Sequence, residues 1–160
     1  MRRGITIATL VFALGLSGCS STQGPAANRS RFMRNVGLAQ PNTARELAMR
    51  IITQYGFTVE QEQPVPNLVI QTRWRERAPF ADEEALGIQH AQNRMFITTR
   101  PRSATNNALT HSVDLVIENR VRLMGSEAWT DASATREYEK WASRIVEDFT
   151  RELNTGGVRR

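Results

Sequence analysis

Cys19 has the most distinctive side-chain chemistry of this chain, because it is the only cysteine among the 160 residues. A single thiol cannot form a disulfide within the chain, and one cysteine with two histidines makes a poor metal site. A free thiol is a liability in an oxidising compartment, so a secreted chain benefits when this thiol is modified. The residues around Cys19 therefore decide what chemistry we expect of it.

The segment before Cys19 has the composition of a secretory signal peptide. A short positive stretch, Met1-Arg2-Arg3, precedes an uncharged and mostly apolar run from Ile5 to Leu16. A run of about a dozen apolar residues suits a signal peptide, whereas a membrane-spanning helix needs about 20. The small residues Ser17 and Gly18 follow, as a signal peptidase requires.

The stretch Leu16-Ser17-Gly18-Cys19, directly after an apolar run, resembles the lipobox of bacterial lipoproteins. In that class a diacylglyceryl group is attached to the cysteine sulfur, the chain is cut just before the cysteine, and the freed amine is usually acylated. The resemblance implies that residues 1–18 are removed and that Cys19 is lipidated, and two or three acyl chains hold a protein stably at a membrane. Ser20 is not the aspartate that signals inner-membrane retention in this class, which implies an outer-membrane location facing the periplasm.

Residues 19–30 are small and polar without periodicity, and we interpret them as a flexible linker between the lipid and a folded domain. Residues 31–155 are enough for a single domain with its own core, followed by a short tail over 156–160. Loss of Arg2 and Arg3 with the signal peptide reduces the formal charge from +5 to about +3. An excess this small gives no reason to expect a nucleic acid as a partner.

Two amphipathic helices are predicted, one on each side of a strand-rich middle. Thr43-Ala44-Arg45-Glu46 has the form of a capping box that would start the first helix, and Gly56 would end it. The second helix would take its N-cap between Asp131 and Thr135 and would stop at Gly156-Gly157. Each helix carries one apolar stripe at helical spacing: Ala44, Leu47, Ala48, Ile51, Ile52 and Tyr55 in the first, and Tyr138, Trp141, Ala142, Ile145, Val146, Phe149 and Leu153 in the second.

Between the helices the apolar period changes to two, which is typical of strands with one buried face. The last two expected strands would form a hairpin through the loop 103–110, and a turn around 64–67 would join the first two. Four strands are expected from this alternation, over 57–60, 68–77, 93–102 and 113–123, with residues 32–38 as a candidate fifth.

The resulting order of elements, (β)αββββα, predicts an α+β fold. Two helices with one apolar stripe each need a surface to cover, and an antiparallel sheet with one apolar face supplies it. We expect a two-layer sandwich with both helices packed on one face of an antiparallel sheet of four or five strands. The stretch from Arg45 to Arg77 is similar to the helix-grip domains of small envelope lipoproteins, such as the C subunit of the outer-membrane β-barrel assembly machine. This resemblance covers only that stretch and carries over no functional residue.

Arginines gather on the predicted strands. Alternation over 68–77 would place Leu68, Ile70, Thr72 and Trp74 on the core face of the sheet. The opposite face would then carry Arg73, Arg75, Arg77, Arg120 and Arg122, interleaved with Asp114 and Glu118. Guanidinium groups bind carboxylate and phosphate in a bidentate manner, so this face is a candidate for binding an anion or a partner. The alternative is a solvated face with cross-strand ion pairs, each worth at most about 1 kcal/mol.

The loop 78–92 contains further candidates. Phe80 and Leu86 would either close the end of the core or mark a partner-binding loop. Asp82-Glu83-Glu84 could bind calcium, but consecutive acids lack the alternating spacing of a calcium loop, and a solvated helix start fits better. His90 and His111 could approach each other across a hairpin, although two histidines without a third ligand make a weak metal site.

No nucleophile elbow, phosphate loop, zinc motif or paired acid and base is present in the sequence. We therefore expect a non-enzymatic module, without cofactor or metal, that is tethered to a membrane and binds or scaffolds another envelope protein in envelope assembly or maintenance. Two alternatives remain open: a lipid or small ligand held in a cavity between helices and sheet, and an unrecognised envelope enzyme. Tight packing around Trp74, Trp141 and Phe149 would leave no room for such a cavity.

Overall fold

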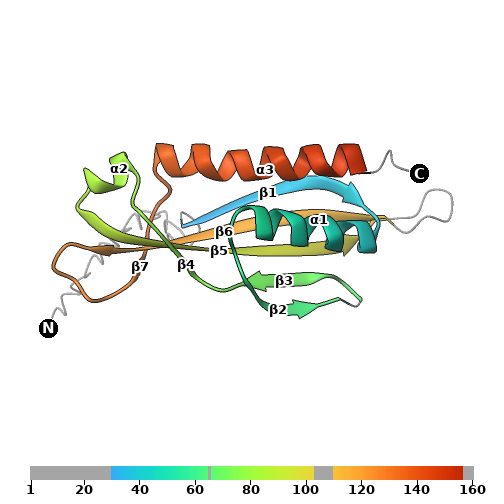
Figure 1. The fold of residues 1–160 in the computed structure, drawn as a ribbon, viewed down its shortest axis with the longest axis horizontal. Helices are drawn as coiled ribbons and strands as arrows, with labels where there is room; N and C mark the ends of the chain where they lie inside the picture. The colour runs from blue at the N-terminus through green and yellow to red at the C-terminus, as the bar shows by residue number, and fades with distance from the viewer. Residues whose placement is uncertain (1–29, 65, 103–109, 157–160) are drawn as a thin grey trace, which may run out of the picture.

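The structure, a computed structural model, describes residues 30–64, 66–102 and 110–156. The predicted signal peptide, the lipidation site Cys19, the linker up to residue 29 and the loop 103–109 lie outside these ranges. In chain order the elements (Figure 1) are β1 (Arg31–Ala39), α1 (Pro41–Gln54), β2 (Val59–Gln63), β3 (Val69–Thr72), β4 (Arg75–Arg77), α2 (Ala81–Glu84), β5 (Ile88–Pro101), β6 (His111–Leu123), β7 (Thr130–Asp131) and α3 (Arg136–Gly156).

The long hairpin of β5 and β6 forms the centre of a seven-stranded antiparallel sheet (Figure 1). β1 extends the sheet beyond β6, and β3 followed by β2 extends it beyond β5, which gives the order β1-β6-β5-β3-β2. β4 also pairs with β5, and β7 pairs with β6. The predicted α+β class is confirmed, but the sheet has more strands than the four or five expected. The stretch 68–77 divides into two strands, and the two residues of β7 are too few to show an alternation.

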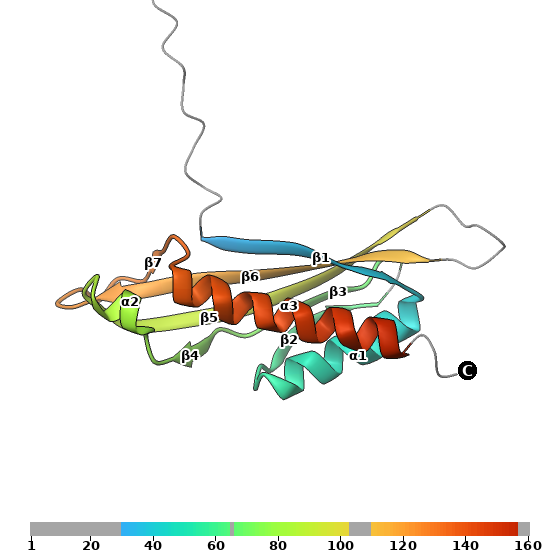
Figure 2. The same cartoon turned by 90° about the horizontal axis from the view of Figure 1, so that it is seen from above.

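The helices α1 and α3 lie side by side on one face of the sheet (Figure 2). Alternate residues of β5 and β6 point toward them, and in both strands these are the odd-numbered residues from 91 to 99 and from 113 to 121. We call the opposite face, which no described helix covers, the open face. The residues that are fully buried between the two layers include Ile51, Ile52, Ile70, Met95, Ile97, Leu115, Ile117, Tyr138, Ile145 and Phe149.

Helix α1 begins three residues earlier than its sequence predicts. Pro41 occupies the first turn, the N-cap residue Gln40 makes no side-chain capping bond, and Thr43 lies inside the helix. The capping box predicted at Thr43 is therefore wrong, because proline suits the first helical position and sets the start there. The predicted end is correct: Gly56 has a φ of +69°, and the amide of Phe57 donates to the carbonyl of Ile52 over 2.9 Å.

Helix α3 obtains part of its N-terminal capping from a distant loop. The hydroxyl of Thr135 accepts a bond of 3.4 Å from the amide of Tyr138, which confirms Thr135 among the predicted caps. The amide of Glu137 donates to Asp82 Oδ2 over 2.9 Å, and the Thr135 hydroxyl donates to Asp82 Oδ1 over 3.0 Å. Asp82 thus satisfies a free amide at the start of α3 and ties α2 to α3.

Candidate functional site

One extra residue between β3 and β4 reverses the side-chain alternation of this part of the sheet. Thr72 lies opposite Met95, since its hydroxyl accepts from the Met95 amide over 2.8 Å, whereas Arg75 lies opposite Asn93. Three steps along β3 and β4 therefore match two steps along β5, which is the geometry of a β-bulge. Beyond this point each residue points to the face opposite to the one that simple alternation predicts.

The bulge separates the arginines that were predicted to share a face. Arg75 and Arg77 lie on the helix side: the Arg75 guanidinium is 5.5 Å from the buried ring of Phe57, and that of Arg77 is 5.7 Å from the ring of Tyr138. Arg73 is exposed at the bulge itself. The predicted single arginine face is thus wrong in composition, because a one-residue shift moves the later arginines to the other side.

Arg120 and Arg122 lie on the open face together with aromatic rings. The Arg120 guanidinium is 4.0 Å from the ring centroid of Trp74 and 5.2 Å from that of Trp129. Arg122 also lies over Trp129, at 5.4 Å. Each of these distances is within the range of a cation–π interaction. Trp74, predicted to face the core, is instead brought to this surface by the bulge.

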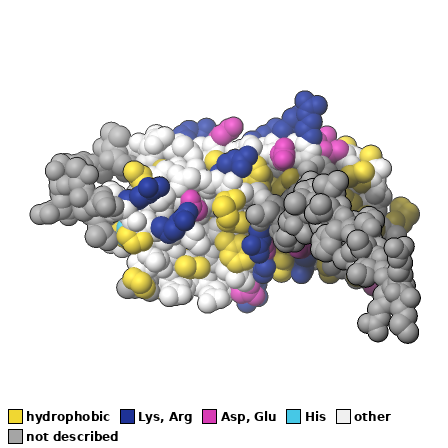
Figure 3. Space-filling model, turned by 180° about the vertical axis from the view of Figure 1, so that it is seen from behind, with side chains coloured by type: hydrophobic (Ala, Val, Ile, Leu, Met, Phe, Trp, Pro, Cys, Tyr) yellow, Lys and Arg dark blue, Asp and Glu magenta, His cyan; other side chains and the backbone are white. Residues whose placement is uncertain are grey.

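The stacking continues across the next strand. The guanidinium of Arg94 is 4.5 Å from the ring of Trp74 and 4.8 Å from the ring of Phe96. Rings and guanidinium groups therefore alternate in one row, with arginines from β6 and β5 and with tryptophans that directly precede β7 and β4. We call this row the ladder; its members are Trp129, Arg120, Trp74, Arg94 and Phe96. Figure 3 shows hydrophobic and basic side chains side by side on this face of the molecule.

The arginines of the ladder are held by different partners. Arg120 donates two hydrogen bonds to the amide oxygen of Gln92, at 2.9 and 2.6 Å. Arg94 donates to Glu118 over 2.7 Å, and Glu118 also pairs with Arg31 over 2.7 Å. Glu118 therefore balances two guanidinium groups, while Arg120 makes no salt bridge among the described residues. Two more acids lie beside the ladder: Glu76 accepts from Gln92 over 2.9 Å, and Asp131 pairs in register with Arg120.

Burial lowers the pKa of Arg120, and the neighbouring guanidinium of Arg94 lowers it further, while Asp131 raises it. Arg120 still remains charged at neutral pH, because the ordinary arginine pKa exceeds 12. Arg120 is partly desolvated, stacked between two rings and bonded to a neutral amide. An anion that approaches such a group is attracted electrostatically and can accept a charge-assisted hydrogen bond. The ladder can therefore accept carboxylate or phosphate groups beside flat or apolar groups.

Arg77 belongs to a second, internal cluster. It pairs with Glu83, whose side chain has no exposed surface, and donates to Asn93 Oδ1 over 2.6 Å and to Asn119 Oδ1 over 3.1 Å. Its guanidinium also lies 4.2 Å from the ring of Phe80. This cluster fixes α2 against the sheet. Arg77, which was predicted to bind an anion or a partner, therefore makes its bonds within the protein.

The two apolar candidates of the loop 78–92 separate in the same way. Phe80 packs on the core, with its ring 6.3 Å from that of Trp141, so it closes the end of the core as one of the two hypotheses held. Leu86 is 66% exposed. Of this pair, only Leu86 is available to a partner.

Two of the three acids of the loop, Asp82 and Glu83, are engaged within the protein, whereas Glu84 is exposed. Glu83 accepts from the amide of Phe80 over 2.9 Å as well as pairing with Arg77. The expectation of a solvated helix start is therefore wrong for Glu83, although a short helix does begin there. The described residues contain no group of three or more His, Cys, Asp or Glu side chains that could hold a metal ion.

The two histidines lie at opposite ends of the β5–β6 hairpin. His90 pairs in register with Arg122, whereas His111 pairs with Pro101. His111 is buried, with Nδ1 3.3 Å from the hydroxyl of Thr99. The two rings do not approach each other across the hairpin, because His90 and His111 lie at opposite ends of the paired strands.

Surface hollows lie along α3, among them one of about 430 Å³ that is lined by Glu139, Lys140 and Ser143. Another, of about 310 Å³, is lined by Phe80, Glu137, Lys140, Trp141 and Arg144. A third, of about 410 Å³, lies over the last turns of α3 between Val146 and Thr155. These hollows are on the outer surface and not between the helices and the sheet.

Sequence reasoning missed four members of the ladder, because it placed Trp74 on the core face and did not single out the other three. Arg94 and Phe96 carried a usable signal, because they alternate with the buried Met95 and Ile97. Trp129 carried none, since it precedes a two-residue strand.

Within the described ranges, no helix combines the length and apolar character needed to cross a membrane. A comparison with known protein families finds none whose model matches this chain, and a search among curated proteins finds no match either.

Proposed function

We propose that this chain is a lipid-anchored, non-catalytic module of a bacterial envelope that binds an acidic surface of another envelope protein through the ladder. The anchoring part rests on the stretch Leu16-Ser17-Gly18-Cys19, and Ser20 favours the outer membrane, with the domain facing the periplasm. The binding part rests on one observation: Arg120 lies between Trp74 and Trp129 and makes no salt bridge among the described residues.

The composition of the ladder favours a protein partner. Tryptophan and arginine dominate the small sets of residues that supply most binding energy at protein interfaces. Stacking and the bonds to Gln92 hold these side chains in place before binding, which reduces the entropy lost when a partner docks. Met33 of β1 adds apolar surface to the same face; it is 57% exposed and pairs in register with Val116.

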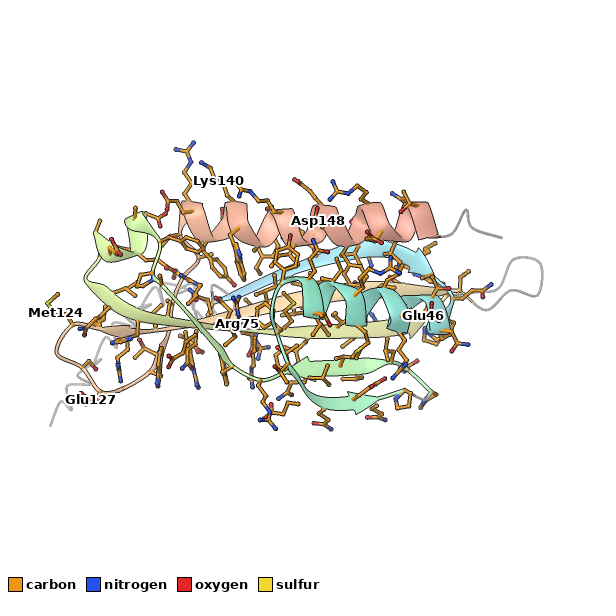
Figure 4. The ribbon with its side chains drawn as sticks, viewed as in Figure 1. Glu46, Arg75, Met124, Glu127, Lys140 and Asp148 are labelled. Atoms are coloured by element: carbon orange, nitrogen blue, oxygen red, sulfur yellow. The ribbon has the colours of Figure 1, made fainter. Side chains whose placement is uncertain are left out.

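The proposal predicts a position-dependent cross-link. A photo-crosslinking amino acid at Met33, on the open face, should capture one specific envelope protein from cells that produce the full chain. The same residue at Lys140, which points away from the sheet on the outer side of α3 (Figure 4), serves as the control and should not. Arg120→Glu should remove the cross-link, because it reverses the charge at the centre of the ladder.

Two results would contradict the proposal. Equal capture from Met33 and Lys140 would show that the open face has no special role, and capture of lipid alone would remove the protein partner. The anchor is tested separately: Cys19→Ala should move the protein from the membrane fraction to the periplasmic fraction. If the Arg120→Glu protein loses the cross-link but still sediments with membranes, partner binding and lipid anchoring are independent properties of the chain.

The other two hypotheses receive less support from the described residues. A ligand between helices and sheet would need space where Ile51, Ile97 and Phe149 are fully buried. An enzyme would need titratable groups that converge in an open cleft, whereas the buried pair Arg77 and Glu83 makes bonds to the protein itself.

A further inference from the structure

An exposed apolar surface lies at the end of the sheet where β6 finishes and β5 starts. Leu86 is 66% exposed, Leu123 is 45% exposed and Met124 is 77% exposed. Two turns bring these residues together, since Leu123 pairs with Ile88 and the amide of Met124 donates to the carbonyl of Gly87 over 3.0 Å. We call Leu86, Leu123 and Met124 the tip.

Both turns of the tip contain a glycine with a positive φ angle and open space around it. Gly87 and Gly125 have φ angles of +78° and +76°, which favour glycine, and an added Cβ at either would meet no atom within 4 Å. Figure 4 shows Met124 at the extreme end of the sheet, beyond α2 and β7. Nothing among the described residues packs over this end, so the leucine and methionine side chains face solvent in the isolated protein.

The chain joins the fold at the same end. The carbonyl of Ser30 accepts from the amide of Asn119 over 3.1 Å, and Asn119 lies four residues before Leu123 on β6. At about 3.3 Å per residue, this places the entry point about 13 Å from the tip along the strand. Leu38, which is 61% exposed, lies at the far end of β1 opposite Ser112.

The segment between Cys19 and Ser30 limits how far this end can be from an anchor. Eleven peptide steps separate the two residues, and a fully extended chain covers at most about 3.6 Å per residue, or roughly 40 Å. A lipid on Cys19 would therefore keep the tip end of the sheet near the bilayer, while Leu38 starts a further eight residues away along β1.

We propose that the tip inserts its apolar side chains into the surface of the same phospholipid bilayer that holds Cys19, an inference that rests on the proposed lipid anchor. Trp129 and Arg122, next to the tip, suit the headgroup level, where tryptophan and arginine are favoured. Glu84 and Glu127 are also exposed at this end, so the insertion is shallow and the acids stay in water. The ladder then stands beside the bilayer, open to a partner.

A label at the tip tests this orientation. Met124→Cys in the full lipidated chain carries an environment-sensitive thiol-reactive fluorophore, and Leu38→Cys carries the same label as the matched exposed control. Both proteins are reconstituted in vesicles of phosphatidylethanolamine and phosphatidylglycerol that contain brominated lipid. We expect at least a threefold greater quenching of the label at position 124 than at position 38, and loss of that difference in Met124→Cys/Leu86→Asp.

Equal quenching at the two positions would overturn the inference. A label at position 124 that is shielded in native membranes but not quenched in the pure-lipid vesicles would also overturn it, because the tip would then dock on a protein. The chain without an introduced cysteine is the remaining control. If it takes up the label, the thiol of Cys19 is free and the anchor proposal has failed, which is a different result from failure of the tip.

Discussion

Arg77 and Glu83 form a two-point ion pair beneath α2, with 2.5 Å between Nη1 and Oε2 and 2.6 Å between Nη2 and Oε1. The Arg77 side chain is 10% exposed and that of Glu83 is not exposed at all. Asn93 and Asn119 complete the hydrogen bonds of the guanidinium. The pair fixes the segment between β4 and β5. This segment contains both Leu86 and Asp82, which caps α3.

Removal of one member of this pair should be costly. Glu83→Ala is expected to lower the free energy of unfolding by about 3–5 kcal/mol, because Arg77 is left charged and buried without its counter-ion. Urea unfolding followed by circular dichroism measures this value. Glu84→Ala, at an exposed position of the same helix, is the control and should change the free energy by less than about 0.5 kcal/mol.

The double variant Arg77→Met/Glu83→Leu distinguishes a general packing defect from an unpaired charge. It should recover part of the lost stability, since no charge then remains buried. A double variant less stable than Glu83→Ala alone would contradict this account.

Stability at low pH should depend on Asp114. Burial raises the pKa of this carboxyl, but hydrogen bonds from Asn35 and Arg100 outweigh it, and the pKa lies below its usual range. Because the folded-state pKa is lowered, the stabilisation is present above the unfolded pKa of about 3.9 and is lost as the pH falls through the folded value. Asp114→Asn should therefore be less stable than the wild type at pH 7, and the difference should shrink below about pH 4.

Urea midpoints measured between pH 7 and pH 3 follow this difference. Arg100→Gln is a matched control, because it removes one of the two partners and should reduce the pH dependence without abolishing it. A gap between wild type and Asp114→Asn that stays constant over the whole range would refute the assignment.

The two tyrosines of the chain should both ionise late. Burial, together with the 2.6 Å bond from its hydroxyl to Asp148, raises the pKa of Tyr55 to about 12. Burial also raises the pKa of Tyr138, whose hydroxyl donates to the carbonyl of Ile117 over 3.2 Å. The raised folded-state pKa of Tyr55 stabilises the fold fully below the unfolded value near 10, and this contribution is lost as the pH rises through about 12.

Ultraviolet absorbance of the phenolate measures this directly. No tyrosine should titrate near pH 10 in the folded protein, and Tyr55→Phe should remove the step near pH 12. A tyrosine that titrates at its ordinary pKa while the circular dichroism spectrum stays native would be the contrary result.

The ladder should show a measurable coupling between Arg120 and Trp74, whose guanidinium carbon and ring centroid are 4.0 Å apart. A double-mutant cycle with Arg120→Met and Trp74→Leu is expected to give a coupling energy of about 1 kcal/mol. The control cycle combines Trp74→Leu with Arg122→Met. Because Arg122 stacks on Trp129, this cycle should give a coupling energy near zero. Equal couplings in the two cycles would mean that stacking on Trp74 is not specific to Arg120.

Local sequence patterns predicted most of the fold. The stripe of α3 is confirmed by the burial of Tyr138, Ala142, Ile145, Phe149 and Leu153, because a helical period depends only on neighbours within two turns. The start of α1 was misplaced, since Pro41 and Thr43 both suit a helix start and only one can be used.

The candidate site was predicted less well than the fold. Alternation correctly placed Arg120 and Arg122 away from the helices, because β6 keeps a regular register with β5 over this part. The same rule failed for Trp74, Arg75 and Arg77, because one unpaired residue before β4 reversed the faces.

From the sequence alone came the features that depend on residue type and short spacing: the single cysteine after small residues, the two helical stripes and the period-two strands. The tertiary structure alone decided which face each arginine occupies, that Glu83 is buried against Arg77, and that Leu86 lies beside Met124. The physical reason is the range of the interactions. Helical and strand periods come from backbone bonds between near neighbours, whereas a bulge, a buried ion pair and an exposed tip depend on how distant strands pair. Cys19 remains the clearest chemical signal of the sequence, and the fold adds which end of the domain the chain enters.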